Sequence, residues 1–118
     1  MGVGGFAAAL PYLRRQTERT LDARAMTGEW LTPETELGCA SGCWLHRAAG
    51  TAPRPVVFEL HGGGFALGDA RKGDALRAWV RDTFDVNVVG IEYRLAPEHP
   101  FPAALNDVAG TVRRIVDG

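Results

Sequence analysis

Three consecutive glycines follow a short apolar run, with a single histidine between them, and this arrangement constrains the chain more than any other feature of its sequence. The apolar run is Pro55–Leu60 (PVVFEL), and the glycines belong to the segment His61–Phe65 (HGGGF). Such a run is typical of a strand covered on both faces, as in a parallel sheet. Glycine costs conformational entropy, so three in a row indicate positive φ angles or a group that must approach the main chain closely. Both needs arise where backbone N–H groups converge on a developing negative charge.

Phosphate binding and a simple tight turn are the alternative explanations of these glycines. A Walker loop requires Gly-Lys and then Ser or Thr, whereas Phe65–Asp69 (FALGD) follows Gly64. The dinucleotide pattern Gly-x-Gly-x-x-Gly also fails, because Leu67 occupies its third glycine position. A tight turn without a binding role remains open at this point.

Helical and strand-like patterns alternate along the chain. Apolar residues at helical spacing predict helices over residues 6–25, over residues 74–84 and from Pro102 onward. Short apolar segments predict strands over residues 37–47, 55–60 and 86–93. This order indicates right-handed crossovers, and so predicts an α/β fold with a mostly parallel sheet flanked by helices.

The helical spacing also predicts which faces are buried. Leu76, Trp79, Val80 and Phe84 share one face of the middle helix, which we expect to pack against the sheet. On the first helix, Arg14 is expected on the solvated face.

The chain has 118 residues, of which 13 are basic and 14 acidic, giving a net charge of -1. The length suits one domain, and the balanced charge offers no field that attracts nucleic acid or an anionic membrane. No apolar run approaches the roughly 18 residues of a membrane helix. We therefore expect neither nucleic acid nor a membrane as a partner.

The two cysteines, Cys39 and Cys43, are too few for a disulfide framework and predict a reduced, cytoplasmic protein. Together with His46 they lack a fourth ligand, so we expect no metal site. No cofactor is expected either.

The HGGGF segment resembles the oxyanion-hole motif of the α/β-hydrolase superfamily, in its branch of hormone-sensitive-lipase-like bacterial esterases. A second signature of that branch follows about thirty residues later, at Tyr93–Asp107 (YRLAPEHPFPAALND). The resemblance implies that residues 1–36 are an N-terminal, cap-like helical segment. It implies that residues 37–118 are the N-terminal part of a catalytic domain with an incomplete sheet, ending before the nucleophile elbow.

The resemblance also implies roles for individual residues. Gly63 and Gly64 are expected to donate two N–H groups to a tetrahedral oxyanion, and Gly62 to shape the turn of this oxyanion hole. Phe65 and Leu67 are expected to line the substrate pocket, with an ordinary core role equally open.

Five further residues are expected to be scaffold. His61 opens the motif and is not expected to be the catalytic base, and Tyr93 opens the second signature. Arg94 and Glu98 have the charges to pair across the proline-rich turn of residues 94–102, and Asp107 is placed to brace it.

The chemistry implied is hydrolysis of small, short-acyl carboxylic esters through a serine acyl-enzyme. The only serine is Ser41, flanked as CASGC, so the Gly-x-Ser-x-Gly elbow is absent and the triad serine, histidine and acid are missing. The chain alone is therefore expected to be inactive. The alternative is a non-catalytic hydrolase-derived module, or half of a split enzyme completed by a second chain.

The resemblance places the 56–60 strand beside the absent nucleophile strand. An apolar central strand with an open edge favours association, so we expect the chain to self-associate there.

Overall fold

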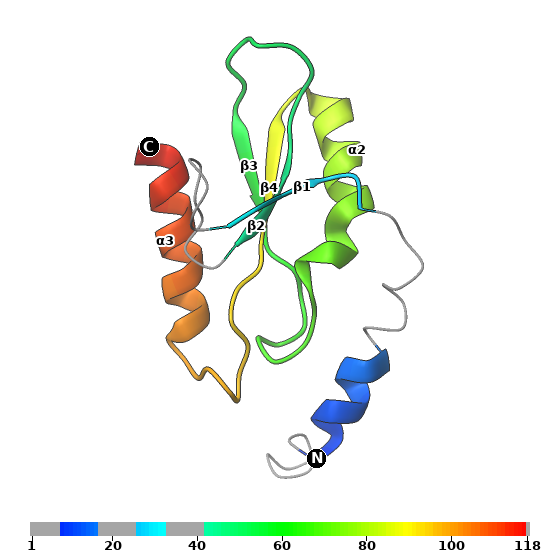
Figure 1. Cartoon of the computed structure of the whole chain (residues 1–118), viewed down its shortest axis with the longest axis vertical. Helices are drawn as coiled ribbons and strands as arrows, with labels where there is room; N and C mark the ends of the chain where they lie inside the picture. Colours follow the sequence, from blue (N-terminus) through cyan, green and yellow to red (C-terminus); the bar gives the residue numbers. More distant parts are fainter. Residues whose placement is uncertain (1–7, 17–25, 33–41, 118) are drawn as a thin grey trace.

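Four short strands form one sheet in the computed structural model of the chain, which describes residues 8–16, 26–32 and 42–117. The strands lie in the order β1-β2-β4-β3 (Figure 1). Their bounds are β1 Glu29–Leu31, β2 Cys43–His46, β3 Val56–Glu59 and β4 Asn87–Ile91. Predictions that concern residues 17–25 and 33–41, among them Cys39 and Ser41, lie outside the described residues.

The predicted α/β class is confirmed, and the described sheet is mixed. Strand β3 pairs with β4 in parallel. The chain that connects these two strands contains the 3₁₀ helix η1 (Ala70–Gly73) and the helix α2 (Asp74–Phe84). The β1–β2 and β2–β4 pairs are antiparallel, so the expectation of a mostly parallel sheet does not fit the described strands. The reason is the connection between β2 and β3, residues 47–55, which is too short for a parallel crossover. The three-residue β1 was not predicted.

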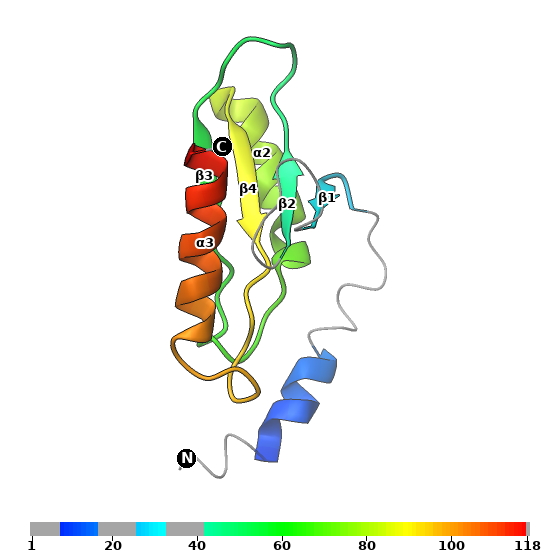
Figure 2. The same ribbon diagram turned by 60° about the vertical axis from the view of Figure 1, so that its left-hand side comes forward.

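Helices α2 and α3 (Ala103–Asp117) cover opposite faces of the sheet (Figures 1 and 2). Side chains alternate along β2 and β4, so every second residue points to α3. This α3 face is the apolar core, formed by Leu31, Cys43, Leu45, Val89, Ile91 and Tyr93, with Val108 and Val112 of α3 packed against it. The predicted final helix therefore buries its apolar stripe in part, because Leu105 and Val116 remain exposed.

Residues 8–16 form a further helix (blue in Figure 1) at the end of the molecule where β3 and β4 terminate. Leu10 is buried, as the predicted apolar stripe requires. Pro11 lies within this helix. The prediction of an N-terminal helix is confirmed for these residues.

The face of α2 that meets the sheet is polar, which corrects the prediction made from its apolar stripe. Leu76, Trp79 and Phe84 are 53%, 58% and 62% exposed, whereas Arg77 is completely buried. Arg77 lies over Gly90 of β4, where an added Cβ would overlap its guanidinium group. Glycine at this position therefore provides the space for a long charged side chain between helix and sheet.

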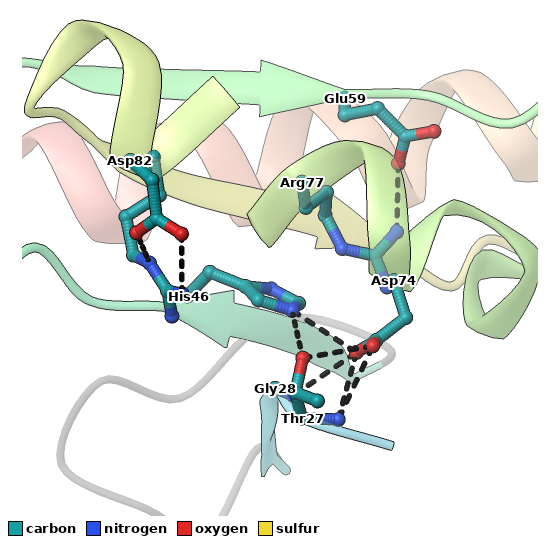
Figure 3. A network of polar contacts seen from close by, with 8 residues as sticks. Thr27, Gly28, His46, Glu59, Asp74, Arg77 and Asp82 are labelled. Atoms are coloured by element: carbon teal, nitrogen blue, oxygen red, sulfur yellow. Dashed lines mark hydrogen bonds and ion pairs between the residues drawn. The ribbon is translucent and has the colours of Figure 1, made fainter. Parts of the chain in front are cut away.

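Hydrogen bonds connect this polar face to three strands (Figure 3). Arg77 Nη1 donates to Glu59 Oε2 at the end of β3 over 2.9 Å. Asp74 accepts hydrogen bonds from the Thr27 and Gly28 amides, which precede β1, and lies 3.0 Å from Nε2 of the buried His46 on β2. Burial lowers the pKa of His46 against the opposing attraction of Asp74, so His46 is neutral at pH 7.

Cys43 is fully buried on β2 and is disulfide-bonded, so the prediction of a reduced thiol here is wrong. A count of two cysteines does not decide their redox state, and the cytoplasmic location stays a prediction. No cluster of metal-ligating side chains occurs in residues 8–16, 26–32 and 42–117. Within the same ranges no helix is long and apolar enough to cross a bilayer.

Replacing Glu59 by Gln is expected to lower the free energy of unfolding by about 3 kcal/mol, because Arg77 then remains buried without a counter-charge. Nε and Nη2 of Arg77 have no partner in the described structure, so no second carboxylate takes over. The double variant Glu59→Leu/Arg77→Met should recover most of this loss. Urea unfolding followed by tryptophan fluorescence measures both. Glu29→Gln, which breaks an exposed pair with Arg47, is the control, and an equal loss in it and in Glu59→Gln would contradict the prediction.

Candidate active site

The HGGGF segment lies where the parallel strands β3 and β4 end (Figure 1). His61 follows β3 by two residues, and Tyr93 follows β4 by two residues. The carboxyl ends of parallel strands are the usual place for ligand binding in α/β proteins. The predicted site therefore occupies the edge of the sheet at which chemistry is expected.

The backbone of this glycine loop (residues 61–68) requires glycine at defined positions. Gly63, Gly64 and Phe65 have φ angles of 128°, 63° and 61°, all in the left-handed region that side chains disfavour. The Gly63 carbonyl accepts from the amides of Ala66 and Leu67 at 3.2 and 2.9 Å, which closes a tight turn. A Cβ on Gly63 would overlap the Leu67 carbonyl group. Phe65 is the non-glycine residue that stores strain here.

Hydrogen bonding in the glycine loop occupies most of its carbonyl oxygens, whereas the amides of its three consecutive glycines have no acceptor among the described residues. The carbonyls of residues 61, 62, 63, 65 and 66 each accept a hydrogen bond. The amides of Gly62, Gly63 and Gly64 donate none to the described residues, and all three glycines are exposed. These N–H groups are therefore available to an outside acceptor.

Among the described residues, hollows adjoin the loop on two sides. One, of about 500 Å³, is lined by His61, Gly62, Gly63, Leu67 and Asp69, among others. The second, of about 350 Å³, is almost entirely apolar and lies between the loop and α3; its lining includes Leu60, Phe65, Phe101, Leu105 and Val108. Leu67 and Phe65, both predicted to line a substrate pocket, thus line different hollows.

The His61 side chain is held by Tyr93. Their rings stack with centroids 4.2 Å apart and planes 5° from parallel, and the Tyr93 hydroxyl donates to the His61 carbonyl over 2.6 Å. His61 Nδ1 lies 2.9 Å from the Gly62 carbonyl. The Tyr93 ring is buried, and burial raises the pKa of its hydroxyl, which keeps it a donor. The histidine is therefore fixed at the base of the loop.

The proline-rich turn is held differently from the prediction. Arg94 pairs with Asp107 of α3, and that carboxylate also accepts from the Arg94 amide at 2.8 Å, so Asp107 does brace the turn. Glu98 pairs instead with Arg14 at 2.7 Å, so the predicted Arg94–Glu98 pair is wrong. Asp107 satisfies both the backbone and the guanidinium of Arg94, an option that charge pattern alone does not reveal. The Ala96–Pro97 and Phe101–Pro102 peptide bonds are cis.

Arg14 was predicted to face solvent and instead contacts this site. Its guanidinium donates to the carbonyls of Ala66 and Ala96 as well as to Glu98. The sequence contains no local signal for these contacts, because they join residues more than fifty positions apart.

An acidic pair beside the loop was also missed. Glu92 follows β4, accepts a hydrogen bond from the Ala70 amide at 3.1 Å, and bonds to the side chain of Asp69. Burial and the nearby Asp69 charge raise the pKa of Glu92 to about 7. Two neighbouring carboxyl groups favour a shared proton. The available signal was an acid inside the otherwise apolar 86–93 run.

A family profile described as an alpha/beta hydrolase fold matches residues 57–118, more than half of the chain. The chain belongs to the α/β-hydrolase family. Its relatives place it in the hormone-sensitive-lipase-like branch, as the two sequence signatures predicted.

Three relatives illustrate the similarity. Esterase LipI of Mycobacterium tuberculosis is 39% identical over 74 residues, which are 63% of this chain and 23% of LipI. Carboxylic ester hydrolase LipN of the same organism is 49% identical over 63 residues, 52% of this chain and 16% of LipN. The hyperthermophilic esterase from Pyrobaculum calidifontis superimposes with a TM-score of 0.75 at 27% identity, over 92% of this chain and 38% of that esterase. The chain thus corresponds to less than a quarter of the length of either curated relative.

The raised pKa of Glu92 predicts a pH-dependent stability. The folded chain binds this proton more tightly than the unfolded chain, so its stabilisation is present at low pH and is lost as pH rises through about 7. The slope from one proton is at most about 1.4 kcal/mol per pH unit. Glu92→Gln keeps an acceptor for Ala70 and should flatten the stability profile between pH 5 and 8, read from urea unfolding at several pH values. Glu29→Gln should keep the wild-type profile; an unaltered profile in Glu92→Gln would refute the assignment.

Proposed function

We propose that this chain supplies the oxyanion hole of a carboxylic-ester hydrolase that works through a serine acyl-enzyme on small, short-acyl esters. The unused amides of Gly63 and Gly64 at the carboxyl end of β3 are the observation that supports it most directly. The names of LipI and LipN, an esterase and a carboxylic ester hydrolase, agree with this chemistry.

The loop contributes to the reaction by binding developing charge. Attack of a serine hydroxyl on the ester carbonyl turns that oxygen into an oxyanion, which needs donors already in position. Gly63 and Gly64 donate two N–H groups, with Gly62 shaping the turn, and each such donor contributes about 3 kcal/mol to the transition state. A third donor is the residue after the nucleophile.

The triad serine, histidine and acid are supplied from outside these 118 residues. The only serine, Ser41, lacks the flanking glycines of a nucleophile elbow. In this proposal residues 37–118 are the N-terminal part of the catalytic domain, residues 1–36 are cap-like, and the chain alone is inactive. The apolar hollow beside Phe65 suits the hydrocarbon part of a small ester.

His61, Tyr93, Arg94 and Asp107 act as scaffold in this proposal. They fix carbonyl oxygens and the neighbouring turn, and leave the glycine amides free. Loop rigidity lowers the reorganisation needed when the oxyanion forms.

A hybrid enzyme tests the proposed function. This chain replaces the corresponding part of LipN, and hydrolysis of p-nitrophenyl acetate is measured for the hybrid and for the chain alone. The hybrid is expected to hydrolyse the ester and the chain alone is not. Gly64→Ala in the hybrid should lower kcat on the order of a hundredfold, because it disturbs one donor amide.

Gly50→Ala is the matched control. Gly50 also has a positive φ angle, 83°, and like Gly64 has open space where the Cβ would stand, but it lies in a loop away from the site. Its backbone strain is therefore similar, and its kcat should stay near that of the hybrid. Equal losses in the two variants would reject the oxyanion assignment. A folded but inactive hybrid would favour a non-catalytic module.

We further propose that the chain self-associates through β3. This strand is at the edge of the described sheet, with Val56 and Val57 each 40% exposed and Leu60 51% exposed. An edge strand with apolar side chains offers its unpaired backbone groups to another chain.

Light scattering coupled to size exclusion should therefore find a mass above 12.7 kDa that increases with concentration. Val57→Lys places a charge on the edge and should shift the chain toward the monomer. Val116→Lys makes the same change on the exposed end of α3 and should not. A monomeric wild-type chain at all concentrations would exclude this interface.

A further inference from the structure

One guanidinium group joins three separate segments of the site. Arg14 lies on the helix of residues 8–16, and its Nε and Nη2 donate to the Ala66 carbonyl at 3.2 and 3.0 Å. Nη2 also donates to the Ala96 carbonyl at 3.0 Å, and Nη1 to Glu98 Oε2 at 2.7 Å. These partners come from the glycine loop and from the proline-rich turn.

The two residues whose carbonyls Arg14 binds are both connected to Phe65, the strained residue of the loop. Ala66 directly follows Phe65, and its own amide donates to the Gly63 carbonyl. The Ala96 amide donates to the Phe65 carbonyl at 2.8 Å. Arg14 therefore binds both the residue that follows the left-handed Phe65 and the turn residue whose amide binds the Phe65 carbonyl.

We propose that Arg14 is a positioning residue that holds the glycine loop in the conformation in which the Gly63 and Gly64 amides donate no hydrogen bond to the described residues. The inference rests on the proposed role of those amides as oxyanion donors. It gives the N-terminal helix a defined task, which is to fix the loop and the proline-rich turn relative to one another. Arg14 itself contacts neither the amides nor a reacting atom.

Arginine suits this task better than lysine. Its planar guanidinium directs several N–H groups at fixed angles, so that it reaches two carbonyls and a carboxylate at once. The side chain is 29% exposed, and the contacts to carbonyls are its less exposed ones. A lysine ammonium is a point donor on a flexible stem and holds fewer of these partners in a single geometry.

Amide exchange in the full chain, measured residue by residue by NMR, tests the proposal. In Arg14→Ala the amides of Ala66, Leu67 and Ala96 should exchange about tenfold faster or more, since their bonds lose outside support. The amide resonances of Gly63 and Gly64 should shift in the same variant. Arg14→Lys should give an intermediate result.

Arg15→Ala is the control, because Arg15 is the exposed neighbour on the same helix. It should leave loop exchange and the two glycine resonances unchanged. Equal effects of Arg14→Ala and Arg15→Ala would overturn the proposal. So would an Arg14→Ala effect of the same size at Val89 in the centre of the sheet, which would indicate general destabilisation.

This measurement needs no substrate and no triad. An inactive LipN hybrid would therefore reject the hydrolase function without affecting the exchange result. Unchanged loop exchange in Arg14→Ala would reject the positioning role and leave the hydrolase function standing.

Discussion

The parallel pairing of β3 with β4 is the constraint on which the site depends. Its register, with Val57 opposite Val88 and Glu59 opposite Gly90, brings both strands to an end at the same edge of the sheet. His61 and Tyr93, each two residues beyond its strand, are therefore neighbours and stack on one another. A shift in this pairing would separate the two rings, and the glycine loop would lose the support of the stacked pair at its base. The loop geometry thus depends on the sheet before it depends on the glycines.

The sequence predicted the elements better than their burial. Strands β3 and β4 and helices α2 and α3 lie within or close to the predicted ranges, because the apolar runs and helical spacing there are clear. The inward face of α2 was predicted incorrectly, since Arg77 is buried and Trp79 is exposed. Hydrophobic spacing cannot reveal that Gly90 leaves room for a guanidinium or that Glu59 neutralises it. Such pairs exist only after the strands have met.

The same limit applies to the site. The two sequence motifs identified the glycine loop and the proline-rich turn. Asp107, which lies close to the turn in sequence, was expected to brace it and does bind the Arg94 amide. The partner that Glu98 shares with the Ala66 carbonyl was not predictable, because it is Arg14 on the helix of residues 8–16. Glu92 and Asp69 were missed for a related reason: an acid in the 86–93 run does not by itself reveal its partner, and it is burial and the nearby Asp69 charge that raise the pKa of Glu92.

In the glycine loop most carbonyl oxygens accept hydrogen bonds, whereas the glycine amides have no acceptor among the described residues. A loop with left-handed residues at 63, 64 and 65 pays a conformational cost that its one internal turn offsets only in part. The remaining support comes from three donors outside the loop, each of which binds a carbonyl oxygen. The Tyr93 hydroxyl binds the carbonyl of His61, the Ala96 amide that of Phe65, and the Arg14 guanidinium that of Ala66. When the carbonyls are fixed, the amides of Gly62, Gly63 and Gly64 are fixed with them, yet these three donate no hydrogen bond to the described residues. A peptide plane held by its oxygen presents its N–H in a direction already set, which is what a site for developing negative charge requires.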